Sequence, residues 1–256
     1  QVIEIPNEVT RIGKKAFYNC RSLEALNFPS DLVLIDEEAF MECEVLNNVV
    51  LPGGVEILGS GSFSQCTTLI DLTFPDGLVS IGDRAFDGCR NLATISFPEQ
   101  LESIGVESFR NCGFQKLEIP SSVVSIGNSA FSTCFYLERA ILPEGIMEVV
   151  PGLFSFCENL NEVHLPDSVT SVGRAAFLGC KKLESIELPQ QIGEIGIQAF
   201  AGCFSLQSIA LPDGIYELPE RSFSGCFALA EVMLPSQVKS IGAYAFQECT
   251  TLTNIL

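Results

Sequence analysis

The amino-acid sequence repeats itself, and this repeat restricts the possible folds more than any other feature. Cysteine returns at a step of 23 residues, except for one step of 22 residues between Cys112 and Cys134. A phenylalanine stands three residues before each of these cysteines, and a proline begins each copy. A period of this length indicates a solenoid in which each copy forms one coil. The prolines that begin the copies lie at positions 6, 29, 52, 75, 98, 120, 143, 166, 189, 212 and 235.

Each column of the repeat has a physical reason. Aligned on proline, the unit reads P-x-x-[VLI]-x-x-[ILV]-G-x-x-[AS]-F-x-x-C-x-x-L-x-x-[ILV]-x-[LF]. The alternation before proline predicts a short strand, which proline ends because it has no N–H group for the next ladder bond. The V-x-x-I-G segment predicts a second short extended piece, and A-F-x-x-C predicts a tight helical or 3₁₀ turn. At the single shortened copy, Phe114 is expected to fill the space of the missing leucine.

One copy cannot fold alone. Its large apolar side chains, about six, contribute roughly 2 to 3 kcal/mol each when buried. Ordering a backbone costs roughly 1 to 2 kcal/mol for each residue. Over a whole copy this cost is larger than the stabilisation from the buried side chains. The copies are therefore expected to stack about 4.8 Å apart through parallel strands, as a single domain over residues 1–256. Both ends fall inside a repeat and the chain starts at Gln1, so we expect a fragment of a longer chain without capping repeats.

The full pattern, L-x-x-[ILV]-x-[LF]-P-x-x-V-x-x-I-G-x-x-A-F-x-x-C, resembles the BspA-like, or Treponema pallidum-type, class of leucine-rich repeats over the whole chain. The resemblance implies an α/β, β-rich leucine-rich-repeat solenoid, a curved stack of about eleven 23-residue coils with a parallel sheet on the concave face. It also implies a kinship with cell-surface adhesion or antigen proteins of bacteria and some unicellular eukaryotes. The sequence lacks the asparagine ladder of commoner leucine-rich repeats, and the cysteine column takes a comparable inward position.

Composition limits the partners. Asp and Glu number 32 against 14 Lys and Arg, for a formal net charge of -18. Such a balance argues against nucleic acid, whose phosphates need clustered basic residues, and favours a basic or neutral protein or glycan.

No apolar run approaches the roughly 18 to 20 residues of a membrane helix, so we expect no membrane insertion within this segment. The N-terminal residues also lack the pattern of a signal peptide.

The eleven cysteines are an odd number at one repeat position, which favours a buried ladder of free thiols. Disulfides between adjacent coils stay an alternative, because coils lie close enough for them. The sequence has no CxxC and no D-x-D-x-D-G loop, so we expect no metal site and no cofactor. His164 is the only histidine, and no Ser or Cys lies in a nucleophile-elbow context. The chain is therefore not expected to be an enzyme.

Two sets of variable positions are candidates for binding. The first, the central patch, comes from positions two and four residues before proline, where a mixed charged and apolar face suits protein recognition. A solvated sheet face without function would look the same. The second, the aromatic edge, directly follows the cysteine; its last two members should stack, although a phenylalanine folded back onto the core is an alternative. The central patch comprises Glu118, Arg139, Ile141, Glu162, His164, Ser185 and Glu187, and the aromatic edge comprises Phe135, Phe204 and Phe227.

The leading hypothesis is a non-catalytic recognition or adhesion module, at the cell surface or secreted, that binds a protein or glycan along the concave sheet. A cytoplasmic protein-interaction scaffold is the first alternative, mildly favoured by unpaired thiols and by the absence of any N-x-[ST] glycosylation site. A structural spacer without a specific ligand is the second.

Overall fold

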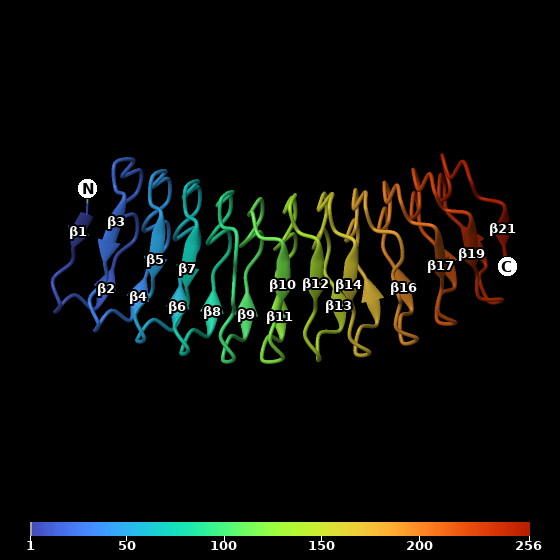
Figure 1. The fold of residues 1–256 in the computed structure, drawn as a ribbon. Helices are drawn as coiled ribbons and strands as arrows, with labels where there is room; N and C mark the ends of the chain where they lie inside the picture. The colour runs from blue at the N-terminus through green and yellow to red at the C-terminus, as the bar shows by residue number, and fades with distance from the viewer. Residues whose placement is uncertain (1) are drawn as a thin grey trace. The chain divides into compact units, whose positions relative to one another are not determined.

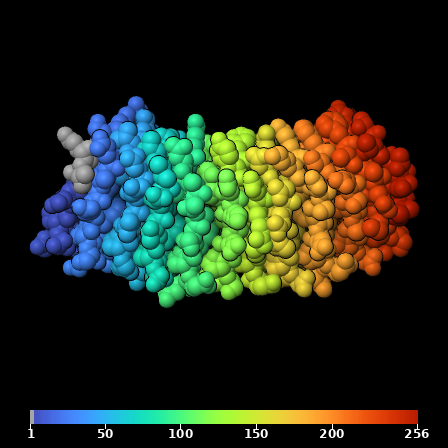
Figure 2. Space-filling view, viewed as in Figure 1, coloured from blue at the N-terminus to red at the C-terminus, as the bar shows by residue number. Residues whose placement is uncertain are grey.

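The chain divides into two compact units, Gln1–Cys134 (the first unit) and Phe135–Leu256 (the second unit). The computed structural model describes residues 2–256, so that Gln1, the first residue of the expected domain, lies outside the described residues. Within each unit, successive coils follow one another side by side in chain order (Figure 1). The side chains of neighbouring coils in a unit meet without a gap (Figure 2). The single domain over residues 1–256 and its curvature stay predictions.

The strands expected before proline are present in most copies, and after Ile3 the middle residue of each three-residue strand is buried or half-buried. In β3, Leu26 is buried and Asn27 is exposed. Residues 94–96 and 185–187 occupy the same repeat position without forming a strand. These pre-proline strands are β1 (Val2–Glu4), β3 (Ala25–Asn27), β5 (Asn48–Val50), β7 (Asp71–Thr73), β10 (Lys116–Glu118), β12 (Arg139–Ile141), β14 (Glu162–His164), β17 (Ser208–Ala210), β19 (Glu231–Met233) and β21 (Asn254–Ile255).

A second row of two-residue strands lies before the glycine position, as the V-x-x-I-G segment predicted. In the first unit these strands form one sheet in the order β2-β4-β6-β8-β9-β11, and in the second unit they form β13-β15-β16 and β18-β20. The pre-glycine strands are β2 (Arg11–Ile12), β4 (Leu34–Ile35), β6 (Ile57–Leu58), β8 (Ser80–Ile81), β9 (Ser103–Ile104), β11 (Ser125–Ile126), β13 (Glu148–Val149), β15 (Ser171–Val172), β16 (Glu194–Ile195), β18 (Glu217–Leu218) and β20 (Ser240–Ile241).

The shortened copy keeps the parallel register, since Ser103 still pairs with Ser125. A Cβ atom at Gly113 would lie 2.3 Å from the carbonyl oxygen of Arg90, so the shortened segment passes too close to the preceding coil for any other residue. Phe114 is fully buried, with its ring edge-on to the rings of Phe109 and Phe131 at 6.3 Å. The prediction that Phe114 fills the space of the missing leucine is confirmed.

The prediction of a helical or 3₁₀ turn around A-F-x-x-C is wrong, and no helix occurs within residues 2–256. The segment forms successive tight turns in which alternate N–H groups bond to the next coil. Phe17 donates to the carbonyl of Ala39 at 2.8 Å, and Asn19 donates to that of Met41 at 2.7 Å. Lys15 and Asn19 have positive φ angles of 59° and 60°. An α-helix would keep these N–H groups within the coil, whereas here they hold neighbouring coils together.

The phenylalanine column runs through the core of each unit. In the first unit the Phe86 ring stacks on Phe63 at 5.5 Å and on Phe109 at 5.2 Å, with interplanar angles of 1° and 12°. In the second unit the rings of Phe200 and Phe223 stack at 5.5 Å. These separations are close to the roughly 4.8 Å between paired strands, so ring stacking and strand pairing share one spacing.

The cysteine column bonds each coil to the coil before it. The Cys66 S–H group donates to the carbonyl of Phe40 at 3.2 Å, and Cys226 donates to that of Phe200 at 3.2 Å. All eleven cysteines are free thiols, nine of them buried, while Cys20 and Cys249 are half-buried. The inward position predicted for this column is thus confirmed for the nine buried members.

Burial also makes the thiols poor nucleophiles. Removal from water raises the pKa of the Cys43 thiol to about 11 and that of Cys203 to about 12, because a buried site disfavours the charged thiolate. The same cause raises the pKa of Cys66, Cys89, Cys112, Cys180, Cys226 and Cys249.

Replacing a ring in the middle of the stack should be costly. Phe86→Ala removes two stacked ring contacts and the edge-on contact with Phe74 and leaves a cavity, so we expect the free energy of unfolding to fall by about 3 to 5 kcal/mol. Urea unfolding followed by circular dichroism measures this loss. Phe17→Ala is the matched control, since Phe17 is only half-buried and stacks on one ring of its column, Phe40; its loss should be smaller. Equal losses at both sites would contradict the stacked column.

The buried thiols should not react in the folded protein. A pKa of about 11 leaves about one Cys43 thiol in a thousand ionised at pH 8. Titration with a disulfide reagent should therefore modify the nine buried cysteines only after denaturant is added, with Cys20 and Cys249 reacting first. Disulfide in the unfolded, non-reduced protein would contradict the free ladder.

The same thiols predict a loss of stability at alkaline pH. An unfolded cysteine ionises near pH 8.5, whereas buried Cys43 ionises only near 11. Above pH 8.5 the unfolded state therefore binds fewer protons than the folded state, and the free energy of unfolding falls as the pH rises. The urea midpoint of a Cys43→Ala variant should depend less on pH in this range than that of the parent chain.

Candidate functional site

The central patch contains one group of side chains in direct contact. Strands β12 and β14 pair in parallel, which sets Arg139 beside Glu162 and Ile141 beside His164. Arg139 Nε lies 3.0 Å from Glu162 Oε1, and His164 Nε2 lies 2.9 Å from the same oxygen. Glu162 and His164 are exposed, and Ile141 is half-buried. The strands thus present a carboxylate in contact with a guanidinium and an imidazole, with an aliphatic side chain beside them.

The charges of this cluster stabilise one another. The hydrogen bond from His164 and the positive charge of Arg139 hold the pKa of Glu162 below its ordinary value. Glu162 therefore stays ionised at a lower pH than an isolated glutamate. Because 38% to 59% of each of these side chains is exposed, their interaction orders the side chains more than it stabilises the fold.

The remaining polar members of the central patch lie outside this contact group. Ser185 and Glu187 are exposed on either side of buried Ile186, which repeats the in-and-out alternation of β14 one coil later. Glu118 is exposed in β10 and belongs to the first unit. We name the six second-unit members the strand-face patch: Arg139, Ile141, Glu162, His164, Ser185 and Glu187.

The aromatic edge is exposed. The rings of Phe204 and Phe227 are in contact, with centroids 4.9 Å apart, but at an interplanar angle of 43° they are tilted and not stacked as predicted. Phe135 is exposed in the second unit as well. The three rings are exposed to solvent, whereas the alternative expected them to fold back onto the core.

Sequence reasoning missed Phe156, which is exposed at the position just before the cysteine. The other copies carry asparagine, glutamate, glutamine, glycine or threonine at this position. A single aromatic residue in a polar column was therefore the signal that could have marked it.

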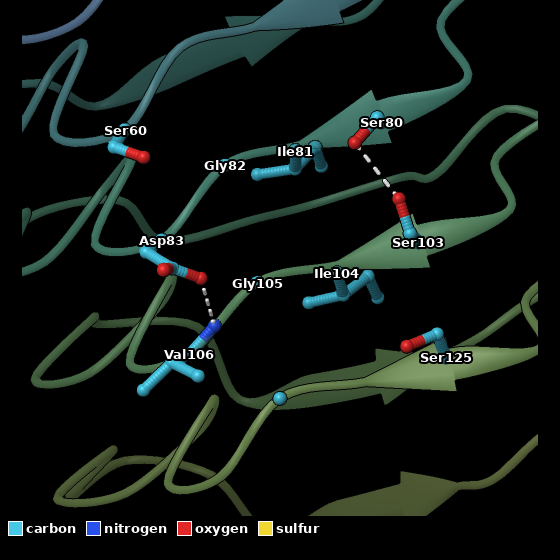
Figure 3. A pocket seen from close by; sticks show the side chains of 11 residues that line it. Ser60, Ser80, Ile81, Gly82, Asp83, Ser103, Ile104, Gly105, Val106 and Ser125 are labelled. Atoms are coloured by element: carbon cyan, nitrogen blue, oxygen red, sulfur yellow. Dashed lines mark hydrogen bonds between the residues drawn. The ribbon is translucent and has the colours of Figure 1, made fainter.

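A hollow of about 360 Å³ lies in the first unit beside β8, β9 and β11 (Figure 3). The Ser103 hydroxyl donates to the Ser80 hydroxyl at 2.8 Å, and Asp83 accepts a hydrogen bond from the backbone N–H of Val106 at 2.8 Å. These polar groups satisfy one another and supply no acid–base pair. The other lining residues are Ser60, Ile81, Gly82, Ile104, Gly105, Ser125 and Gly127.

Over the part of the chain that the structure describes, no three histidine, cysteine or acidic side chains are arranged to hold a metal ion. Over the same residues, no helix has the length and apolar character needed to cross a membrane.

Solved structures share the architecture. A leucine-rich repeat protein from Bacteroides ovatus is 26% identical over 99% of this chain and 86% of its own, with a TM-score of 0.51. A leucine rich cell surface protein from Faecalibacterium prausnitzii is 28% identical over 99% and 86%, with a TM-score of 0.55. The T. pallidum leucine rich repeat protein is 29% identical over 80% and 77%, with a TM-score of 0.54.

Comparison with proteins of curated function gave no significant match. The family model described as a BspA type leucine rich repeat region, with six copies, matches residues 1–78, 58–184 and 171–256. These overlapping matches cover both units from end to end, and they agree with the stacked parallel coils. The chain therefore belongs to the BspA-type leucine-rich repeat family.

Proposed function

We propose that the chain is a non-catalytic recognition module that binds a protein partner through the strand-face patch. The observation that carries this proposal is the contact group of Arg139, Glu162 and His164 on two paired strands. The only histidine of the sequence thereby contacts a carboxylate that also pairs with a guanidinium, in a cluster suited to recognition. Membership of a family of repeat proteins generally involved in protein interaction or adhesion supports the same function.

The patch is well suited to binding because its side chains are held in place before a partner arrives. Backbone pairing fixes the positions of Arg139 and Glu162, and their ion pair restricts the long arginine side chain. Arg139 therefore loses less side-chain freedom when a partner binds than an unpaired arginine would. Half-buried Ile141 adds apolar area beside the charges.

The charge of the chain favours a basic or neutral partner. The net charge is -18, and exposed Glu162 and Glu187 carry the same sign at the patch. A basic partner is attracted over a distance set by the ionic strength, which raises its rate of association. We propose a protein in preference to a glycan because the patch combines charged groups with an aliphatic side chain.

We propose a location at the cell surface. The relative from F. prausnitzii is described as a cell surface protein, which supports this location. The cytoplasmic scaffold stays a second candidate, favoured by eleven free thiols, because free thiols persist in reducing compartments.

Charge reversal at the patch tests the proposed function. Random peptides displayed on phage are selected on the immobilised chain, and the strongest binders are expected to be basic. A Glu162→Lys/Glu187→Lys variant should weaken them by about tenfold or more, since two like charges then oppose the partner. The affinities are measured by fluorescence anisotropy at two salt concentrations.

The matched control is Glu56→Lys/Glu102→Lys, which makes the same charge change at exposed positions beside the pre-glycine strands of the first unit. It should leave the affinity within about twofold, because these positions belong to another column of the repeat than the strand-face patch. Peptides that bind the strand-face variant as tightly as the parent chain would show that partners use another surface.

A further inference from the structure

The exposed phenylalanines gather on one edge of the second unit. Within residues 3–256, the phenylalanines exposed by more than a third are Phe135 and Phe156 at 45%, Phe204 at 39% and Phe227 at 40%. All four stand directly before or after a cysteine of the ladder. In the copies of the first unit, the residues directly after the cysteine are Arg21, Glu44, Thr67, Arg90 and Gly113. The aromatic residues thus distinguish this edge from the corresponding edge of the first unit.

Three of these rings lie along four successive coils, with Lys181 and no ring in the coil between Phe156 and Phe204. We name them the aromatic ridge: Phe156, Phe204 and Phe227. The Phe156 ring leans over the next coil, where a Cβ atom on Gly179 would lie 2.9 Å from its Cδ1 atom. In that coil the Lys181 ammonium lies 5.8 Å above the Phe204 ring, which in turn contacts Phe227. Three coil steps of about 4.8 Å make the ridge about 14 Å long.

Glycine beside the ridge leaves the rings uncovered. Gly202 and Gly225 have φ angles of 71° and 75°. At the same repeat position Asn19 and Gln65 adopt φ angles of 60° and 61° with full side chains. The turn therefore does not require glycine. Its consequence here is bare backbone next to two rings that stay exposed, although Lys181 lies over one of them, Phe204.

We propose that the aromatic ridge is a docking surface for a protein segment that carries apolar side chains next to a basic side chain. Exposed aromatic rings on a rigid backbone are typical of the residues that dominate binding energy at protein interfaces. This surface lies on another column of the repeat than the strand-face patch and goes beyond the function proposed above.

Charge selects this occupant over two others. A second copy of the chain would bring together two molecules of net charge -18, and an anionic lipid surface would repel the chain for the same reason. A basic side chain is attracted both by this charge and by the faces of the rings. Lys181 above Phe204 is an example of the ring–cation contact within the chain itself.

Designed peptides of equal length test the ridge. The first contains leucine, phenylalanine and arginine, the second replaces arginine by glutamate, and the third replaces the apolar residues by serine. Fluorescence anisotropy with the parent chain should show the tightest binding for the first peptide. Phe204→Ser/Phe227→Ser should weaken this binding by at least tenfold, because each ring contributes as an interface anchor.

The control Val124→Ser/Met147→Ser removes apolar side chains of 69% and 64% exposure on another column of the repeat, four residues after proline, and it should bind like the parent chain. Phe204→Leu/Phe227→Leu should keep part of the affinity and show a smaller preference for arginine over glutamate, since the ring faces are gone while the net charge remains. Thermal melting checks that each variant is folded, and Glu162→Lys/Glu187→Lys reports separately on the strand-face patch.

Several results would overturn the proposal. The first is no binding of the apolar basic peptide, and the second is binding that survives the double serine variant. Ring-dependent binding to phosphatidylserine vesicles without peptide binding would assign the ridge to a lipid surface. Ring-dependent dimers in sedimentation, without peptide binding, would assign it to a second copy.

Discussion

The contact between one coil and the next is the interaction on which the other features depend. A 23-residue coil has too little apolar surface to fold alone, so its core residues become buried only against equivalent residues of its neighbours. Ring stacking at 5.2 Å between Phe86 and Phe109, thiol donors on phenylalanine carbonyls and alternate turn amides on the next coil all use the same step along the stack. Each feature therefore constrains the others to one register.

This arrangement leaves only certain columns free to vary. Outward residues of the pre-proline strands and the residues around each cysteine meet solvent, and neighbours from successive coils make a surface there. In the first unit some of these residues are paired, as in the ion pair of Arg21 with Glu44 at 3.4 Å, both of which directly follow a cysteine. In the second unit the same columns hold the clustered side chains of the strand-face patch and the exposed rings of the aromatic ridge, and the two proposals of binding rest on these two groups.

The sequence predicted the strands, the inward columns and the burial of Phe114, because each follows from burial of apolar residues at a fixed period. The turn after glycine was predicted wrongly, since the spacing of Ala, Phe and Cys fits a helical turn and a stacked turn equally well. Only the bonds from Phe17 to the following coil distinguish them, and these are not local. The contact of Arg139 with Glu162 follows from their equal repeat positions, whereas the link of Glu118 to the patch stays a prediction.

The pairing of each strand with its equivalent in the adjacent coil has a mechanical consequence. A force that pulls on one end of a unit acts first on the hydrogen bonds of the outermost coil, and the next coil bears the load only after these have broken. Each released coil adds 23 residues, or about 80 Å of extended chain. Under tension a unit would therefore lengthen in nearly equal steps, dissipating work at each one while the coils still stacked keep their surfaces intact.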